Sequence, residues 1–324
     1  MARVGVLHRI PHNSERGHAI GDPKLPREFL ERFEKRALPL LRGEIKIDND
    51  PKRDTTSQEK IVVSSPAKPA ILRHSDFDYR AIPEGSIAEP VGTHTGAEKI
   101  ALNVVRMSPE EKWKLDRSAS EENIVVVFDG SGEAETINGH HVLDRGAALY
   151  SPTGQPLELL SGKTGLHVYV WRSTLRGDEQ RSENPRTFNR LDNDETQLKN
   201  FYGTEGMDPS EETAVMNFVF WPGTGSSRLC LHCGHMEPGQ TFNVHVHPES
   251  EEAFMAFSGS GQFYLADGWY PAEAGDVLFA PPGVPHGTRL PRSDEMPDEF
   301  VTCGGPTPFD KVLYERASVP TEVK

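Results

Sequence analysis

Four residues in the last third of the chain have metal-binding side chains at spacings that would bring them together. His245 and His247 are two residues apart in a segment typical of a β-strand, so both imidazoles point to one face. Glu252 follows a proline-initiated turn and can return on the next strand to face them. His286 follows a Pro-Gly turn and adds a third imidazole. Imidazoles with a carboxylate suit Fe, Mn, Ni, Cu or Zn.

Short strands must position these residues. Apolar segments such as 124–128, 254–257, 262–265 and 276–280 are separated by Gly, Pro and Asn-Gly or Asp-Gly turns. Regularly spaced short strands with such turns indicate an antiparallel sandwich or barrel.

An internal repeat shows that this β-module occurs twice. Residues 128–157 align with 257–286 without a gap, at a constant offset of 129. The matches fall mainly on turn residues and include the hairpin signals Asn138-Gly139 and Asp267-Gly268. The sequence therefore predicts two copies of one hairpin-rich module.

The second copy resembles the cupin superfamily. Residues 239–259 match its first motif, G-x5-H-x-H-x4-E-x6-G, and residues 275–286 match its second, G-x5-P-x-G-x2-H. A lone histidine is more often a hydrogen-bonded side chain than a ligand, but four ligand types at matching spacings rarely arise by chance. Glu252, not Glu251, stands seven residues before Gly259 as the motif requires, so we expect Glu251 to be outward and solvated. Leu290 departs from the frequent Asn of the second motif, at a packing position.

The resemblance implies two cupin barrels, an all-β double-stranded β-helix or jelly-roll fold, and a dimeric or higher assembly. It implies one divalent metal held by His245, His247, Glu252 and His286. This set is similar to that of quercetinase-type dioxygenases and oxalate decarboxylases. The segment 268–277 is also similar to ureidoglycine aminohydrolases, two-module cupins with metal in the second module, although their ligand pattern differs.

The first copy departs from the metal-binding pattern. The repeat offset places Asp116, Ser118, Asn123 and Leu157 at the four ligand positions. Leucine cannot coordinate a metal, so we expect the first barrel to be metal-free and to support the second. A vestigial ligand pocket in the first barrel is the alternative.

Residues near the ligands are candidates for substrate contacts or acid–base chemistry. Asn243 has the strand parity of His245 and is expected to point inward, and Phe254 is a candidate apolar wall or an ordinary core residue. Arg228, His232 and His235 lie on the preceding strand, whose facing the sequence does not fix. We take Arg228, His235 and Asn243 as the catalytic candidates.

The remaining segments frame these modules. We assign residues 1–70 to an arm with a helical pattern at 25–38, 71–172 to the first barrel and 173–212 to a polar linker. Residues 213–316 form the metal-binding barrel, and residues 317–324 form a tail.

Composition restricts the partners. A net charge of -14 without a concentrated basic run disfavours nucleic acid and anionic membranes. No stretch approaches about 18 consecutive apolar residues, and the first residues lack a signal-peptide pattern. Three cysteines, Cys230, Cys233 and Cys303, argue against a disulfide framework. The spacing of Cys230 and Cys233 could indicate zinc or redox chemistry, but the sequence has no second such motif and the segment has the pattern of a strand. We expect a cytoplasmic homo-oligomer, most simply a dimer, that binds a small molecule.

These observations favour a metal-dependent cupin enzyme for a small oxygenated metabolite. A dioxygenase with Fe(II) is the first hypothesis, with Mn, Ni or Zn as other metals. A hydrolase, lyase or isomerase is the second hypothesis. A non-catalytic small-molecule-binding protein is the third.

Overall fold

The computed structural model describes residues 67–115, 120–177, 179, 181–198, 212–293 and 297–311. The expected arm up to residue 66, with its helical pattern, lies outside these residues, as do Asp116, Ser118 and the tail. No helix among the described residues is long and apolar enough to cross a membrane.

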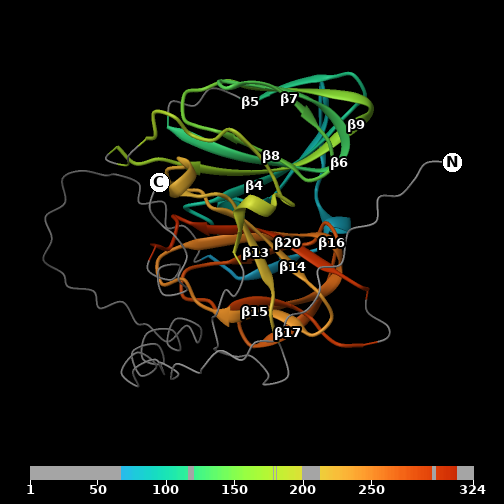
Figure 1. Cartoon of the computed structure of the whole chain (residues 1–324), viewed down its shortest axis with the longest axis vertical. Coiled ribbons are helices and arrows are strands. Elements are labelled where there is room, and N and C mark those ends of the chain that lie inside the picture. The colour runs from blue at the N-terminus through green and yellow to red at the C-terminus, as the bar shows by residue number, and fades with distance from the viewer. Residues whose placement is uncertain are drawn as a thin grey trace, which may run out of the picture. The chain divides into compact units, whose positions relative to one another are not determined.

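Nine strands of the described chain form a first antiparallel sheet (Figure 1). They follow the order β10-β8-β6-β9-β4-β3-β2, with β5 beside β9 and β7 beside β6. Their bounds are β2 (Arg80–Ile82), β3 (Gly85–Val91), β4 (Ala101–Met107), β5 (Lys112–Leu115), β6 (Glu121–Thr136), β7 (Gly139–Leu143), β8 (Ala147–Ser151), β9 (Leu157–Thr174) and β10 (Phe188–Arg190).

Eleven described strands form a second sheet. Its path is β11-β13-β14-β20-β16-β19-β15-β12, with β17 and β18 beside β16 and β1 beside β18. Their bounds are β1 (Ala70–Leu72), β11 (Gln197–Leu198), β12 (Glu212–Thr213), β13 (Val215–Phe220), β14 (Leu231–Met236), β15 (Gln240–His245), β16 (Glu251–Leu265), β17 (Gly268–Glu273), β18 (Val277–Ala280), β19 (His286–Leu290) and β20 (Phe300–Thr307).

Within the described ranges, four short 3-10 helices connect these strands: η1 (His74–Asp76), η2 (Thr93–Thr95), η3 (Asp194–Thr196) and η4 (Pro222–Thr224). The expected all-β fold is therefore confirmed. The two repeat hairpins turn at residues 137–138 and 266–267, directly before the glycine of each turn dipeptide.

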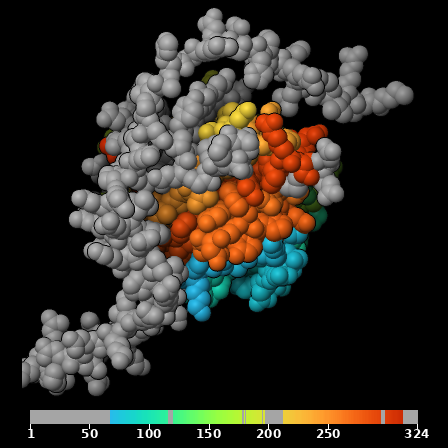
Figure 2. Space-filling model, turned by 90° about the horizontal axis from the view of Figure 1, so that it is seen from below, coloured from blue at the N-terminus to red at the C-terminus, as the bar shows by residue number. Residues whose placement is uncertain are grey.

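The buried apolar residues form three cores. One lies within the first barrel, one lies within the second, and the third combines side chains of both sheets. Strand alternation produces this division, because Ala253 and Met255 of β16 join the shared core while Phe254 and Ala256 join the second-barrel core. Blue atoms of the first described residues adjoin the orange second barrel in Figure 2, consistent with the β1–β18 pairing.

The repeat extends into the contact between the barrels. Phe128 and its repeat equivalent Phe257 pack edge to face, with ring centroids 6.0 Å apart. Glu122 accepts hydrogen bonds from the backbone N–H groups of residues 227–229 of the other barrel. Its equivalent, Glu251, accepts them from residues 98–100. The same offset of 129 therefore relates both sides of each contact.

The expectation that Glu251 is outward and solvated is wrong. Its side chain is only 2% exposed because it points into the contact between the barrels, away from the interior that Glu252 faces. A buried carboxylate needs compensating hydrogen bonds, and the three N–H groups supply them.

The segment expected to be a polar linker, 173–212, contains strands of both sheets. Asn189 of β10 donates to the carbonyl of Val219, and Asn217 of β13 donates to the carbonyl of Leu191. These buried asparagines form hydrogen bonds between the two barrels. Polar residues in this part of the segment therefore contribute to the contact between the barrels.

We predict that Glu251→Ala destabilises the protein. The variant leaves three N–H donors without their charged acceptor, and that of Ile100 is buried. We expect this loss to lower the free energy of unfolding by about 3 kcal/mol. Chemical denaturation followed by tryptophan fluorescence measures the change. Glu249→Ala, at an exposed neighbouring position, is the control and should be near neutral. Equal effects of the two variants would contradict the assigned role.

Candidate metal centre

The four predicted ligands come from neighbouring parts of the second barrel. His245 ends β15, His247 lies two residues beyond that end, Glu252 is near the start of β16, and His286 begins β19. His245 and His286 are directly paired across β15 and β19. The far end of β16 also lies beside these strands, because Leu265 pairs with His286. Curvature of this one long strand around the interior thus brings Glu252 opposite the histidines.

The side chains of these four residues converge. One donor atom of each lies within 4.8 Å of the others. Oε2 of Glu252 is 2.7 Å from Nε2 of His286, 3.0 Å from that of His247 and 3.8 Å from that of His245. Glu252, His247 and His286 are almost fully buried, whereas the His245 side chain is 28% exposed. The cluster is therefore least buried at His245.

Each imidazole is oriented by a hydrogen bond from its other nitrogen. Nδ1 of His245 donates to the carbonyl of Asn243, and Nδ1 of His286 donates to the carbonyl of Val284, both at 2.8 Å. Nδ1 of His247 donates to Oδ2 of Asp310 at 2.9 Å. Because these acceptors require the proton on Nδ1, each neutral ring keeps an Nε2 lone pair for a ligand.

The donor set fits a divalent transition-metal ion. Nε2 of His247 is buried, and it makes no hydrogen bond with the described residues although it is close to Glu252. A buried nitrogen without a hydrogen-bond partner is costly unless another group satisfies it. A cation bound by three Nε2 atoms and one carboxylate oxygen would satisfy all four side chains.

Burial and charge also perturb the protonation of the cluster. Burial raises the pKa of Glu252, but the surrounding histidines outweigh this effect and hold the pKa well below its ordinary value. Burial lowers the pKa of His286 to about 4. Burial also lowers the pKa of His247, but Asp310 and Glu252 outweigh it and raise the pKa to about 9.

Apolar side chains surround the cluster on the inside of the barrel. The ring of Phe254 lies 6.2 Å from that of His286 and packs against Phe263. Leu290, at the position that departs from the second motif, is fully buried in the same core. Phe254 is therefore both a core residue and part of the wall beside the cluster.

Asn243 is buried, but the parity argument for it does not hold. The pairing of β15 with β19 shifts between Phe242 and His245, and such an irregularity breaks the alternation of side chains. Both side-chain amide atoms of Asn243 are buried without a hydrogen-bond partner among the described residues.

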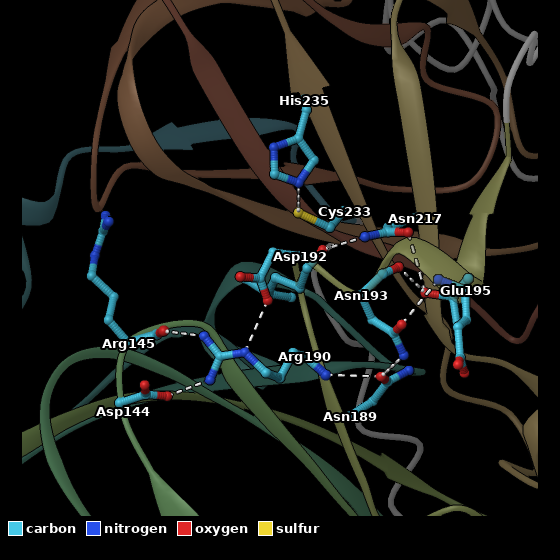
Figure 3. A network of polar contacts seen from close by, with 12 residues as sticks. Asp144, Arg145, Asn189, Arg190, Asp192, Asn193, Glu195, Asn217, Cys233 and His235 are labelled. Atoms are coloured by element: carbon cyan, nitrogen blue, oxygen red, sulfur yellow. Dashed lines mark hydrogen bonds and ion pairs between the residues drawn. The ribbon is translucent and has the colours of Figure 1, made fainter. Parts of the chain in front are cut away.

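The structure does not bring the other two catalytic candidates to the cluster. Arg228 is buried at the contact between the barrels, where its guanidinium contacts the carbonyl of Thr174 and Glu179. Nε2 of His235 lies 3.6 Å from Sγ of Cys233, on the strand face that joins the core shared by the barrels (Figure 3). Strand alternation excludes His235 because Cys233, its neighbour on the same face, belongs to that core.

His232 and Asp310 are the additional residues at the cluster. Nε2 of His232 lies 3.4 Å from Oε1 of Glu252, so this histidine is the one of the three strand candidates that faces the site. The orientation of His232 could not be predicted from the sequence, because a turn separates its strand from β15. Asp310 follows β20, and no spacing in the sequence connects it with His247.

The first barrel has different groups at the equivalent positions. Asn123 is buried there, and Leu157 belongs to the apolar core of that barrel. A metal-free first barrel remains a prediction, consistent with these two residues. The three cysteines are buried and form no disulfide with one another. Cys230 belongs to the second-barrel core and Cys233 to the shared core, so these two residues face different cores.

Comparisons with known proteins agree with this architecture. Residues 233–297 match the family model described as a cupin domain. A 55-residue segment is 34% identical to the (S)-ureidoglycine aminohydrolase of Arabidopsis thaliana, covering 17% of this chain and 18% of that protein.

Two solved structures share the fold across most of the chain. A putative glyoxylate-induced protein of Pseudomonas aeruginosa has a TM-score of 0.59 and 13% identity, with 80% of this chain and 93% of that chain covered. An oxalate decarboxylase of Bacillus subtilis has a TM-score of 0.53 and 16% identity, with 91% and 87% covered. At these identities the likeness shows the fold alone, and the predicted two-barrel cupin architecture is confirmed.

We predict that removing the acceptor of His247 weakens metal binding. Asp310→Ala leaves Nδ1 without its partner, and loss of such an outer partner typically lowers metal affinity about 10- to 100-fold. Asp310→Asn keeps a hydrogen-bond acceptor but loses the negative charge. Its metal affinity should therefore lie between those of the wild type and Asp310→Ala. Calorimetric titration of the metal-free protein with Zn(II) measures the affinities, and Asp298→Ala, at an exposed position, is the control.

We also predict that metal binding releases protons at neutral pH. Since the pKa of His247 is raised to about 9 in the metal-free site, the ring carries a proton at pH 7.5 that the ion must displace. Affinity should therefore fall steadily as the pH decreases below that pKa. Calorimetry in buffers of different ionisation enthalpy counts the protons released, and a count near zero at pH 7.5 would contradict the prediction.

Proposed function

We propose that this chain is a metal-dependent enzyme whose second barrel holds one divalent transition-metal ion and acts on a small oxygenated metabolite. The observation that carries the proposal is the orientation of three imidazoles by Nδ1 hydrogen bonds, so that their Nε2 atoms surround one oxygen of Glu252. Histidines that merely fill a core are not expected to direct three Nε2 atoms at one carboxylate oxygen.

The residues of the chain have separable roles in this proposal. His245, His247, Glu252 and His286 would hold the ion, which when bound would supply a Lewis acid and, if redox-active, an electron donor. The partly exposed His245 side lets a substrate approach. Phe254 and the aromatic core behind it exclude bulk water from the opposite side.

As the reaction we propose dioxygenation with Fe(II). Three neutral imidazoles and one carboxylate suit iron and leave positions for a substrate oxygen and O2 on a six-coordinate ion. An apolar wall suits reactive oxygen chemistry because it keeps water away. Mn, Ni and Zn fit the same donors, and zinc would restrict the chemistry to reactions without electron transfer.

A hydrolase or lyase is the second candidate. The specific observation in its favour is the short segment of 34% identity with an aminohydrolase. The shared stretch covers less than a fifth of either protein, so it supports a related barrel more strongly than a related reaction. A non-catalytic binding protein is the third candidate, with a small molecule as the partner in each case. Assembly as a homodimer in the cytoplasm remains part of the proposal.

We predict that the iron-loaded protein consumes O2 with a small enolic or phenolic substrate. The protein would be freed of metal, reconstituted anaerobically with Fe(II), and tested by oxygen electrode and by the spectrum of its nitric oxide adduct. We expect about one iron per chain and a nitrosyl spectrum that changes when the substrate binds.

The controls separate the metal site from the reaction. The double variant His245→Ala, His286→Ala should lose stoichiometric metal, while His235→Ala should retain it. Metal retention by the double variant would overturn the assigned ligands. If the iron form neither binds nitric oxide nor consumes O2, while the Zn, Mn or Ni form converts a substrate without O2, the second candidate replaces dioxygenation.

A further inference from the structure

The two oxygens of Glu252 have different neighbours. Oε2 faces the Nε2 atoms of His247 and His286 at 3.0 and 2.7 Å, whereas Oε1 faces Nε2 of His232 at 3.4 Å. His232 lies outside the group of four whose donor atoms lie within 4.8 Å of one another. His232 therefore contacts the carboxylate without being one of the four converging donors.

We infer that His232 is a positioning residue that holds Oε1 of Glu252 away from the metal. This inference rests on the proposed metal site and describes how that site keeps room for a substrate. Carboxylates bind metals through one or both oxygens. With Oε1 engaged by His232, Glu252 coordinates through Oε2 alone.

The fold keeps His232 in this place. It lies on β14, between β13 and β20, with Phe218 as its partner on one strand and Gly304 on the other. Its neighbours in sequence, Leu231 and Cys233, are fully buried in the core shared by the barrels. The His232 side chain itself is 16% exposed and faces the interior. Both strand neighbours anchor the backbone, so the imidazole has little freedom to leave Glu252.

The number of open coordination positions follows from this contact. Three imidazoles and one oxygen leave two positions on a six-coordinate ion, whereas a two-oxygen Glu252 would leave only one. Two open positions admit a substrate that binds through two oxygens, or one substrate oxygen together with a second small ligand. His232 thus determines what the metal accepts without touching it.

An ordinary core histidine is the competing interpretation of His232. In that case the imidazole would merely be satisfied by the nearest carboxylate, and its removal would alter stability but not coordination. The two interpretations differ in the coordination number of the ion and in the binding of a two-oxygen ligand, both of which can be measured without any enzymatic reaction.

The experiment compares four proteins loaded with Co(II): wild type, His232→Ala, His232→Gln and His235→Ala. The Gln variant retains an N–H donor toward Oε1. His235→Ala removes a histidine of the same strand from its opposite face. X-ray absorption and visible spectra report the coordination of cobalt, and titration with oxalate, a two-oxygen probe, reports the open positions. Cobalt content after desalting shows that the probe does not extract the ion.

We expect one cobalt per chain in all four proteins. His232→Ala should gain an oxygen ligand from Glu252 and bind oxalate about tenfold more weakly, a typical effect of losing an outer partner. His232→Gln and His235→Ala should resemble wild type. Unchanged spectra and oxalate affinity in His232→Ala would overturn the inference, and so would failure of Gln to restore them. Absence of stoichiometric cobalt in the wild type would overturn the proposed metal site as well. Cobalt content therefore distinguishes failure of the metal site from failure of the His232 inference alone.

Discussion

A buried carboxylate, Glu252, is the constraint on which the second barrel depends. Its side chain is 2% exposed, and an ionised carboxylate at that depth is strongly unfavourable without charged or hydrogen-bonding partners. Four histidines surround this carboxylate, with Nε2 of three near Oε2 and Nε2 of His232 near Oε1. A cation bound between Oε2 and the three Nε2 atoms would neutralise the negative charge of Glu252, which neutral imidazoles cannot do. The electrostatics of the interior thus favour occupation by a metal.

The neighbouring glutamate shows how one strand serves two purposes. Glu251 and Glu252 are adjacent in β16, so alternation sends one carboxylate to the contact between the barrels and the other to the cluster. The first barrel keeps the contact glutamate as Glu122 but has Asn123 at the cluster position. The two repeats therefore share the residue that joins them and differ at the residue that would bind metal.

The contact between the barrels also supports the site. β14 carries His232 on its inner face while Leu231 and Cys233 pack on the other face against the first barrel. Trp171 of the first barrel donates its indole N–H to the carbonyl of Ala253, directly after Glu252. The first barrel, which we predict to be metal-free, thereby packs against the two strands that carry His232 and Glu252. This mechanical role gives a physical reason for retaining the first copy.

The repeat, the all-β fold and the four converging residues could be predicted from the amino-acid sequence, because each depends on spacing along the chain. The two-residue spacing predicted that His245 and His247 lie together, and their donor atoms do converge with those of Glu252 and His286, although β15 already ends at His245. The facing of His232 and His235 required the folded chain, because a turn separates their strand from β15 and interrupts the two-residue period. Alternation gives Glu251 the face opposite to Glu252, but its burial depends on the first barrel, which covers that face. Asp310 could be found only in the folded chain, because contact between distant segments leaves no local pattern.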